Sequence, residues 1–392
     1  MTMDRDNNHN VDWDLAFALS NQSVVAKPKI SLPISQVLNR VLAQDLVSQI
    51  SLPPAHTAMM DGYAVFGPGP WSVIGELHAG SYLPYLESGC ALKVSTGAHL
   101  PPHCSFVIPQ EFASLYGGSV ASKNAFNAGQ HIRIPGDEAE AGEVIATAGT
   151  LLTPAVMGLA TSSQIDEVSV YEKALVSIIV TGSELVSTGS PDLGQIRDSL
   201  TVQVSTWVEY LGANIGTNVN CPDDLAVLKD LLMTSTGEII VVTGGSAHGE
   251  RDYLRTALTE LNATYVIDEI LMRPGHPSLL AKLPSGQLVA GLPGNPLAAL
   301  VSFLTIVAPA LRGLSGQSNF RMAKAPLRLD FPCDRTRVVP VVLTAGKAQL
   351  TEFRGSAMLR GLSQADGLAV ITPGENLAGT LVRILPLPWR TN

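Results

Sequence analysis

Three short segments of this chain combine glycine, hydroxyl and amide or carboxyl groups, and each follows an apolar run. They are Thr181-Gly182-Ser183-Glu184, Thr243-Gly244-Gly245-Ser246 and Gly291-Leu292-Pro293-Gly294-Asn295-Pro296. The glycines of the second segment can adopt positive backbone angles and turn their N–H groups toward an anion. In the third, Pro296 suits the first position of a helix, whose free N–H groups could also bind an anion. An ordinary strand-to-helix connection is the alternative explanation for both.

Two carboxylates accompany these segments. Glu184 ends the first segment, and Asp252 lies just beyond the second. Such oxygens suit Mg²⁺, which usually binds one or two carboxylates together with substrate phosphates and water. The alternative is that both are solvent-exposed acids of ordinary turns. Residues 174–316 contain 13 acidic and 7 basic residues, a net charge of −6, so an anionic ligand would need a metal or nearby cations. The nearest arginines in sequence, whose guanidinium geometry suits oxyanions, are Arg251, Arg255 and Arg273.

The region that must position these residues alternates strand and helix patterns. Apolar runs predict buried strands at 174–180, 238–242, 264–271 and 288–290. Apolar residues at helical spacing predict four helices: one after Asp198, one after a cap at Asp223 or Asp224, one at about 250–261 and one at 297–311. This order predicts a doubly wound, mostly parallel, three-layer α/β domain at 173–316. Ligands of such a sheet belong at the carboxyl ends of its strands, where the three segments lie.

The flanking regions predict other domains. Helical spacing occupies the start of the chain, with an amphipathic helix expected between residues 30 and 46, and it returns after 147. Between them, short apolar stretches separated by Gly and Pro predict a β-rich module at 51–146. We therefore expect a discontinuous helical linker domain, 12–50 with 147–172, that carries the module as an insertion. Short runs with turn signals at 325–392 predict a C-terminal β domain.

Composition indicates a folded chain with several domains. Of the 392 residues, 46% are hydrophobic and only 15% are charged, which is a globular rather than a disordered balance. This length favours two to four domains. The formal net charge is −9 and no stripe of Lys and Arg is present, so nucleic acid is not expected as a partner.

Several features favour the cytoplasm. The first ten residues lack the basic and apolar regions of a secretory signal. The longest uncharged run, 284–311, is interrupted by two prolines, so a buried helix is expected and no membrane partner. Widely separated cysteines indicate reduced structural thiols rather than a zinc or redox motif; they are Cys90, Cys104, Cys221 and Cys333.

The motifs, taken in order, resemble one family along most of the chain. Residues 57–65 resemble its Ser-Ala-Met-Asp-Gly-Tyr-Ala signature, and Ser95-Thr96-Gly97-Ala98, with Pro101 and Glu111, resembles its Thr-Gly-Ala region. Further motifs match at 181–185, 194–199, 243–253, 291–296, 355–359 and 365–368. The chain is similar, over about 12–387, to the molybdopterin molybdenumtransferases, which include MoeA and the gephyrin E domain.

The resemblance implies a four-domain homodimer that inserts molybdate into adenylylated molybdopterin, releasing AMP with help from Mg²⁺. It implies a site shared between the sheet domain of one subunit and the β module of the other. The implied catalytic residues are Asp61, Thr96, Glu184, Asp252, Arg273 and His276, with Glu184 and Asp252 as metal ligands. The implied substrate- and cofactor-binding residues are Thr181, Gly182, Ser183, Asp198, Thr243, Gly244, Gly245, Ser246, Gly294, Asn295 and Pro296.

The chain departs from the family pattern at several positions. The usual Lys-Pro-Gly-Lys-Pro is Arg273-Pro274-Gly275-His276-Pro277, which replaces one permanent cation with a histidine. Ser183 stands where an acid is usual, and Gly-Gly-Val-Ser-Val-Gly has become Gly244-Gly245-Ser246-Ala247-His248-Gly249. A low-activity or non-catalytic paralogue that binds molybdopterin as a scaffold or carrier, together with other cofactor-assembly proteins, is therefore the alternative. A nucleotide-cleaving relative of the CinA group is disfavoured by the Asp61 segment and the C-terminal β domain.

Overall fold

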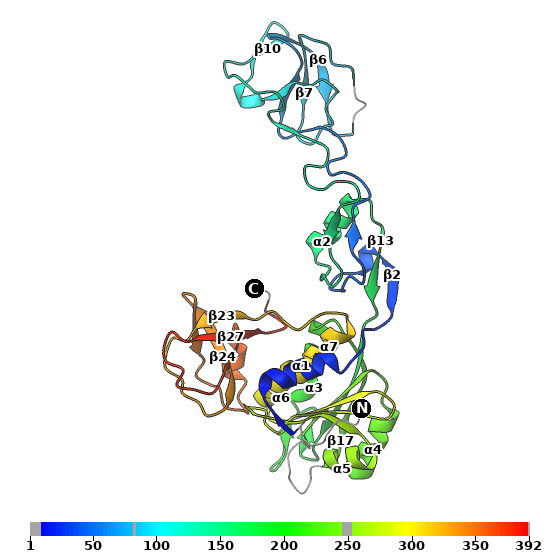
Figure 1. Ribbon diagram of the computed structural model, residues 1–392, viewed down its shortest axis with the longest axis vertical. Coiled ribbons are helices and arrows are strands. Elements are labelled where there is room, and N and C mark those ends of the chain that lie inside the picture. Colours follow the sequence, from blue (N-terminus) through cyan, green and yellow to red (C-terminus); the bar gives the residue numbers. More distant parts are fainter. Residues whose placement is uncertain (1–8, 81–83, 245–252, 391–392) are drawn as a thin grey trace. The chain divides into compact units, whose positions relative to one another are not determined.

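The computed structural model describes residues 9–80, 84–244 and 253–390. They form two compact units, one from Met1–Ile30 with Tyr171–Asn392 and one from Ser31–Val170. Figure 1 shows both and labels some of their helices and strands.

A seven-stranded sheet is the centre of the first unit. Its order is β1-β19-β21-β22-β18-β14-β17. The bounds are β1 His9–Val11, β14 Leu175–Thr181, β17 Asn214–Cys221, β18 Ile239–Thr243, β19 Thr264–Ile270, β21 Leu279–Lys282 and β22 Leu288–Leu292. Strand β21 is antiparallel to both neighbours, and the other described pairings in this sheet are parallel. The sheet is therefore mixed but mostly parallel, as the sequence predicted.

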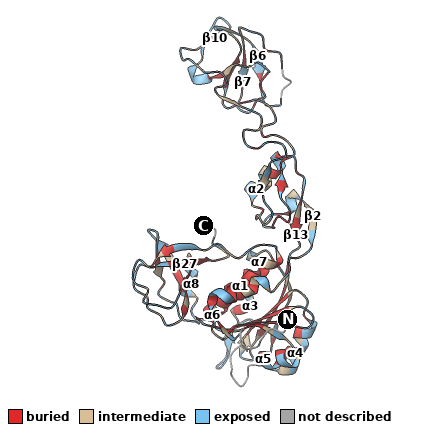
Figure 2. Cartoon of the chain, viewed as in Figure 1, coloured by how far each residue is buried: buried red, intermediate tan, exposed pale blue. Residues whose placement is uncertain are grey.

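Helices cover both faces of this sheet. On one face pack α1 (Trp13–Gln22), α3 (Leu200–Tyr210) and the continuous helical segment formed by α6 (Pro296–Ser302), the π-helix η4 (Phe303–Val307) and α7 (Ala308–Leu314). On the other pack α4 (Leu225–Thr234) and α5 (Tyr253–Glu260). Alternate residues of one strand enter different cores: Ile178 packs with the first set and Ile179 with the second. Figures 1 and 2 show the two layers of helices and their buried faces, which confirms the three-layer arrangement.

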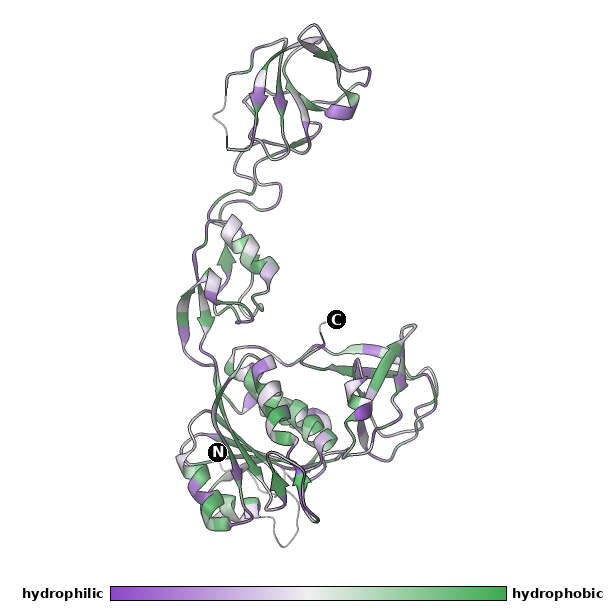
Figure 3. Cartoon of the chain, turned by 180° about the vertical axis from the view of Figure 1, so that it is seen from behind, coloured by the Kyte–Doolittle hydropathy of each residue, from purple (hydrophilic) through white to green (hydrophobic). Residues whose placement is uncertain are grey.

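One described helix, Pro296–Leu314, is long and apolar enough to cross a membrane, but 89% of its apolar window is buried inside the protein. Figure 3 shows its hydrophobic colouring within the helical layer. Thr305 gives it a polar attachment, because its hydroxyl accepts a hydrogen bond of 3.0 Å from the Trp13 indole on α1. The helix is thus a core element of the sheet domain, as expected from the interrupted apolar run.

The first unit contains a second sheet, formed by β20 and by strands that follow residue 322. Its order is β20-β24-β26-β27-β23, with β25 also paired to β24. The bounds are β20 Met272–Arg273, β23 Ala323–Pro326, β24 Thr336–Thr344, β25 Lys347–Leu350, β26 Gly367–Ile371 and β27 Leu381–Pro386, with α8 at Arg360–Ser363. Only Leu271 separates β19 from β20, so the chain passes directly from the first sheet into the second, where Arg273 pairs with Arg337 of β24.

The second unit contains the expected β module. Its six-stranded sheet has the order β8-β5-β7-β6-β10-β9. The bounds are β5 Gly62–Val65, β6 Trp71–Leu77, β7 Cys90–Val94, β8 Phe106–Pro109, β9 Ser114–Tyr116 and β10 Ser119–Ala121. Two-stranded pairs join β11 (Ile132–Arg133) to β4 (Thr57–Ala58), β12 (Val144–Ala146) to β3 (Leu46–Val47) and β13 (Glu167–Tyr171) to β2 (Lys29–Pro33). The remaining elements are α2 (Pro154–Ser162) and the 3-10 helices η2 (Ile34–Gln36) and η3 (Gln110–Phe112).

The prediction of an amphipathic helix between residues 30 and 46 is wrong. This stretch instead contains β2, η2 and isolated bridges, and Asn39 has a left-handed φ of +60°. Its backbone groups bond to remote residues, as the Leu42 N–H does to the Thr150 carbonyl at 2.9 Å. The three- and four-residue spacing of apolar side chains arose because Val37, Val41 and Leu42 are buried from an irregular, extended backbone.

The start of the expected linker domain also differs. Helix α1 packs against η4 and α7 and contributes Trp13 and Phe17 to the core of the sheet domain. It therefore belongs to the first unit and not to a linker domain that begins at residue 12. A short helix with large apolar side chains has no local signal that tells which domain it joins.

All four cysteines are free. Burial raises the pKa of the Cys104 thiol to about 11. Burial, with the nearby carboxylates of Asp223 and Asp224, raises the pKa of the Cys221 thiol to about 11 as well. Thiols that stay protonated are poor nucleophiles, which agrees with a structural role.

Candidate active site

The carboxyl ends of three parallel strands lie in one row. Val180 of β14 is in register with Thr243 of β18, which is in register with Leu292 of β22. The segments after these strands are the three singled out in the sequence. They therefore lie side by side at one edge of the sheet, where open α/β sheets bind ligands.

Glycines bring the backbone segments of this edge into contact. Gly244 has φ +80°, and a Cβ on it would lie 2.6 Å from the Thr181 hydroxyl and 2.9 Å from the Thr181 carbonyl oxygen. A Cβ on Gly294 would lie 3.8 Å from the Gly244 Cα. We call Thr181, Gly182, Thr243, Gly244 and Gly294 the glycine-rich half of the edge.

Thr243 has an unusual polar environment. The residue is fully buried, and within the described residues its hydroxyl has no hydrogen-bond partner. Its carbonyl oxygen accepts a 3.0 Å hydrogen bond from the Thr181 hydroxyl. An unpaired buried hydroxyl costs about 1–3 kcal/mol. A buried hydroxyl without a partner calls for a specific cause, and a bound ligand is one of these.

The loop after β14 is fixed by a carboxylate that the sequence analysis considered only as a cap. Asp223 accepts a 3.2 Å hydrogen bond from the Ser183 N–H, and the Ser183 hydroxyl accepts one of 3.0 Å from the Asp223 N–H. The Glu184 carboxylate lies against Gly182, where a Cβ would be 2.7 Å from Oε2. Glu184 is exposed, and its carboxylate makes no hydrogen bond or ion pair with any other described residue. It is therefore available to a ligand.

Two other carboxylates near this edge are helix caps. Asp198 accepts hydrogen bonds from the N–H groups of Leu200 and Thr201, at 2.9 and 3.0 Å, at the start of α3. Asp224 does the same for α4, with bonds of 2.8 and 3.0 Å from Ala226 and Val227. The cap at Asp223 or Asp224 is thus resolved in favour of Asp224.

The start of α6 does not offer free N–H groups. The Leu297 and Ala298 N–H groups donate to the Ser356 carbonyl oxygen at 2.9 and 3.1 Å. The expectation that this helix start binds an anion is therefore wrong, because a loop of the C-terminal β domain already satisfies it. Asn295 and Gly294, just before the helix, remain exposed at the edge.

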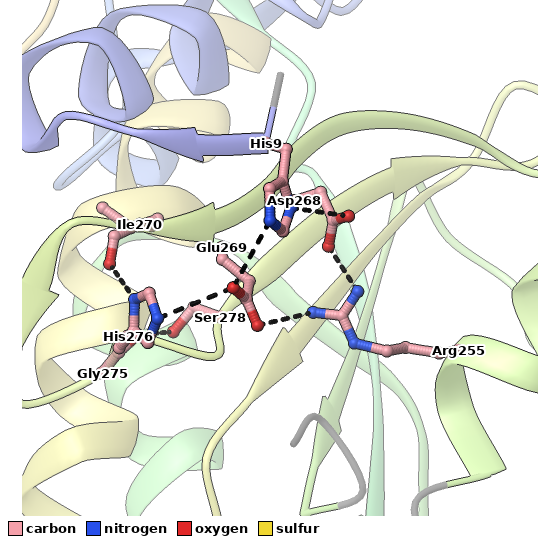
Figure 4. Close-up of polar contacts among 8 residues, drawn as sticks. All are labelled: His9, Arg255, Asp268, Glu269, Ile270, Gly275, His276 and Ser278. Carbon is pink, nitrogen blue, oxygen red and sulfur yellow. Dashed lines mark hydrogen bonds and ion pairs between the residues drawn. The ribbon is translucent and has the colours of Figure 1, made fainter. Parts of the chain in front are cut away.

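A cluster of charged side chains occupies the other half of the same edge (Figure 4). The His276 Nε2 atom lies 3.6 Å from Glu269 Oε2, and its Nδ1 atom lies 2.8 Å from the Ile270 carbonyl oxygen. Arg255 forms an ion pair with Asp268, and its Nη2 atom lies 3.6 Å from Glu269 Oε1. Arg255 is therefore already engaged by carboxylates, contrary to its expected role as a cation for an oxyanion. We call His9, Arg255, Asp268, Glu269 and His276 the charged half.

The two halves are separated by several strands. Asp268 is in register with Leu279, Leu279 with Gly291, and Gly291 with Val242. Three strand spacings place Asp268 about 14 Å from Val242. Arg273, which lies beyond β19, is exposed and unlike Arg255 has no ion pair in the described part of the chain. A hydrogen bond from its own backbone, together with the charges of Arg335 and Arg273, lowers the pKa of Asp334.

In the second unit, Asp61 is held by Thr96. The Thr96 N–H and hydroxyl donate to Asp61 Oδ1 at 2.7 and 2.9 Å. These two bonds, the backbone bond most, lower the pKa of Asp61. The next residue must be glycine, since a Cβ on Gly62 would lie 2.0 Å from the Ile108 carbonyl oxygen. The result is a charged carboxylate on a fixed turn.

Some expected site residues cannot be placed. Gly245, Ser246 and Asp252 lie outside the described residues. Within the described ranges, no group of three or more His, Cys, Asp or Glu side chains is arranged to hold a metal ion. Of the expected metal ligands, the structure therefore describes Glu184 alone.

Family models match nearly the whole chain. The MoeA N-terminal region (domains I and II) matches residues 11–163, a probable molybdopterin-binding domain matches 177–313, and the MoeA C-terminal region (domain IV) matches 322–387. A molybdopterin molybdenumtransferase of Haemophilus influenzae is 31% identical over 324 residues, which cover 76% of this chain and 79% of the relative. The chain belongs to the MoeA family of molybdenum cofactor biosynthesis.

Other members of the MoeA family extend this similarity. Molybdopterin molybdenumtransferase 2 of Mycobacterium tuberculosis is 29% identical over 385 residues, 91% of this chain and 95% of that protein. A crystal structure of a MoeA protein from Pyrococcus horikosii is 27% identical and aligns with a TM-score of 0.75 over 96% of this chain and 99% of its own. The predicted family and the predicted multidomain α/β-plus-β fold are both confirmed.

For this member of the MoeA family, the sequence analysis missed two groups around the site. Asp223 lies two residues after β17, a strand that was not among the predictions, so no strand-end signal pointed to it. Glu269 and His9 had no such signal, because Glu269 lies within an expected strand and His9 lies in a polar N-terminal stretch.

Proposed function

We propose that this chain is a transferase that inserts molybdate into adenylylated molybdopterin, with Mg²⁺-dependent release of AMP, and that it acts as a cytoplasmic homodimer. The observation that carries the proposal is the meeting of Thr181, Gly244 and Gly294 at the carboxyl edge of the sheet. Glycines there add no side chains and leave the backbone open to a diphosphate. Membership of the MoeA family supports the reaction class.

Charge decides what the residues of this edge would do. The substrate carries a diphosphate bridge and molybdate is a dianion, yet the sheet domain has a net charge of −6. The Thr243–Ser246 segment would hold the nucleotide end, and Asn295 with its flanking prolines would shape the pterin pocket. Exposed Arg273 would supply the permanent cation for the oxyanion. Holding molybdate beside the dithiolene removes much of the entropic barrier.

Glu184 and Asp252 would hold Mg²⁺, which when bound stabilises negative charge on the departing phosphate oxygen. The exposed Glu184 carboxylate, which makes no hydrogen bond or ion pair with other described residues, fits this role. Ser183 and Asp223 would keep the Glu184 loop in place through their reciprocal hydrogen bonds.

Incubation of the purified protein with adenylylated molybdopterin, molybdate and Mg²⁺ tests the proposal. We expect AMP and molybdenum cofactor to form together, and Glu184→Gln to abolish both. Asp192→Asn, on an exposed residue of the same connection, is the matched control and should retain full turnover. AMP release that does not need molybdate, or no release at all, would contradict the transfer reaction.

Asp61 would reach the site of a partner subunit. Its fixed, charged carboxylate supports this role. An Asp61→Ala homodimer should be inactive, and mixing it with Asp252→Ala subunits should restore activity, because one site of each mixed dimer would keep both acids. No recovery in verified mixed dimers would rule out a shared site.

One observation favours the alternative of a scaffold or carrier. The charged half pairs Arg255 and His276 with carboxylates, which leaves fewer cations for an oxyanion than the family motif would provide. A scaffold would bind molybdopterin tightly without producing AMP. The same incubation, followed by measurement of bound molybdopterin, separates the two functions.

A further inference from the structure

We propose that His9 is a positioning residue for the oxyanion site. When His9 and His276 take up protons, both rings close on Glu269 and fasten strand β1 beside the end of β20, which carries Arg273, and the turn that follows it. This inference rests on the proposed function in one respect, namely that this turn attracts molybdate. Its structural part, a proton-linked attachment of β1, stands independently.

Glu269 is the centre of the arrangement (Figure 4). It is 7% exposed and has a φ of +67°, in the left-handed region that non-glycine residues disfavour. A residue held in that conformation depends on its surroundings. Its carboxylate faces three cationic or potentially cationic side chains from three different elements: Arg255, His9 and His276.

The hydrogen bond of the His276 ring determines what its other nitrogen can do. Since a carbonyl oxygen only accepts, the Nδ1 atom 2.8 Å from the Ile270 oxygen carries the proton. In a neutral ring Nε2 then presents a lone pair to Glu269 Oε2 at 3.6 Å, whereas a protonated ring presents an N–H group. Proton uptake therefore converts this contact from repulsion to attraction.

His9 is in an equivalent position on β1. Its Nδ1 atom lies 3.3 Å from Asp268 Oδ2, and its Nε2 atom lies 3.9 Å from Glu269 Oε2. Both ring nitrogens face carboxylates, and only one of them carries a proton in the neutral form. His9 is 47% and His276 38% exposed, so both rings can exchange protons with solvent.

The two protons reverse the charge of the charged half. Arg255, Asp268 and Glu269 together carry −1 while both rings are neutral, and the cluster carries +1 when both are protonated. A hollow of about 600 Å³ next to His276 has other charged groups on its wall. They are Asp12, which caps α1, Asp14, which pairs with Arg383, and the pair Asp334 and Arg335. Each of these side chains already forms an ion pair or caps a helix. The change in charge therefore comes from the two imidazole rings.

Strand β1 transmits the effect to the proposed anion site. It has three residues, and its register with β19 consists of His9 with Asp268 and Val11 with Ile270. The Val11 carbonyl oxygen accepts a 2.8 Å hydrogen bond from the Leu271 N–H, two residues before Arg273. For so short a strand, the contacts of His9 are a substantial part of the attachment.

Molybdate titration calorimetry at pH 6 and pH 8 tests the effect on the anion. We expect the wild type to bind molybdate roughly three- to tenfold more tightly at pH 6, the size expected for screened charges in a partly exposed site. His9→Gln should lose about half of this difference on a logarithmic scale, and Glu269→Gln nearly all of it. His56→Gln, an exposed histidine of the other unit, should leave it unchanged. Equal pH dependence in His9→Gln and the wild type would overturn the proposal.

Hydrogen exchange of the Leu271 amide tests the attachment without any ligand. After correction for intrinsic rates, we expect its protection to fall severalfold from pH 6 to pH 8 in the wild type and in His56→Gln, and to stay constant in His9→Gln. If molybdate does not bind but the amide protection of Leu271 changes with pH as expected, the proposed function is overturned and the proton-linked attachment of β1 is supported. A pattern that does not differ between His9→Gln and His56→Gln would overturn the attachment itself.

Discussion

The glycine-rich half and the charged half share one sheet edge but differ in charge. Both contain buried polar atoms without a hydrogen-bond partner among the described residues, the Thr243 hydroxyl in one and Nε and Nη2 of Arg255 in the other, but the Arg255 charge is balanced by ion pairs. In the glycine-rich half, Gly244 lies against Thr181, and the buried Thr243 hydroxyl has no partner among the described residues. In the charged half, Arg255 and His276 face Asp268 and Glu269 within the protein.

This contrast helps to distinguish binding from support. A site that binds a ligand keeps groups unpaired at a cost in stability, whereas a supporting cluster pairs its charges internally. We therefore expect substitutions in the glycine-rich half to act mainly on turnover. Substitutions in the charged half should act mainly on stability and on pH dependence.

The largest expected effect is that of Gly244→Ala. The new Cβ would lie 2.6 Å from the Thr181 hydroxyl at a φ of +80°, so the segment must shift. A displacement of about 1 Å costs roughly a hundredfold in rate, and AMP release should fall at least that much. Gly189→Ala is the control, because Gly189 has a similar φ of +76° and open space around it. Comparable turnover in the two variants would remove the distinction between the halves.

Glu269→Ala should have the largest effect on stability. It removes one of the two carboxylates that face the largely buried Arg255. We expect a loss of about 2–3 kcal/mol in the free energy of unfolding, below the range for breaking a fully buried pair, because Arg255 keeps Asp268 as a partner and the histidines are partly exposed. Glu260→Ala breaks the exposed pair with Lys229 and should cost less than about 1 kcal/mol. Urea unfolding followed by circular dichroism measures both. Equal losses of stability in Glu269→Ala and Glu260→Ala would show that the contacts of Glu269 contribute no more than an exposed ion pair.

Asp198→Ala tests a residue whose role is open. As a cap of α3 it should cost about 1 kcal/mol, and Asp198→Asn, which keeps an acceptor oxygen, should cost little. Thr153→Ala, at the cap of α2, provides a matched loss in the other unit. If Asp198→Asn retains stability but loses AMP release, the carboxylate binds a ligand as well as capping the helix, and the glycine-rich half extends to α3.

Thr96→Val should produce the smallest effect and sharpens the contrast between two carboxylates. Hydrogen bonds from Thr96 stabilise the negative charge of Asp61 and lower its pKa, whereas Glu269 faces cationic or potentially cationic side chains. Because its pKa is lowered, Asp61 stays ionised when the pH falls below the ordinary pKa of an aspartate. Loss of the Thr96 hydroxyl should raise the Asp61 pKa toward that ordinary value. Carbon-13 NMR titration of the Asp61 carboxyl measures the change, with Thr96→Ser as the control. An unchanged titration would leave the backbone N–H as the whole cause.

The sequence predicted much of the sheet domain because its signals are local. Runs such as Leu175–Thr181 and Ile239–Thr243 are apolar along their length, as strands buried on both faces must be. Asp224 directly precedes the apolar spacing of α4, so its capping role was among the predictions. Strands β1, β17 and β21 were missed. Strands β1 and β21 have only three or four residues, which carry no usable periodicity, and β17 (Asn214–Cys221) contains mostly polar residues and no apolar run.

The sequence by itself therefore determined four of the seven strands of the sheet, the candidate caps, the three edge segments and the family. Tertiary structure decided which polar groups are free. The start of α6 is satisfied by the carbonyl of Ser356, and His276 faces Glu269, although neither pairing has a local signal. The physical reason is that secondary structure follows from spacing within one segment, whereas the pairing of a charge or an N–H group depends on which distant segment folds against it.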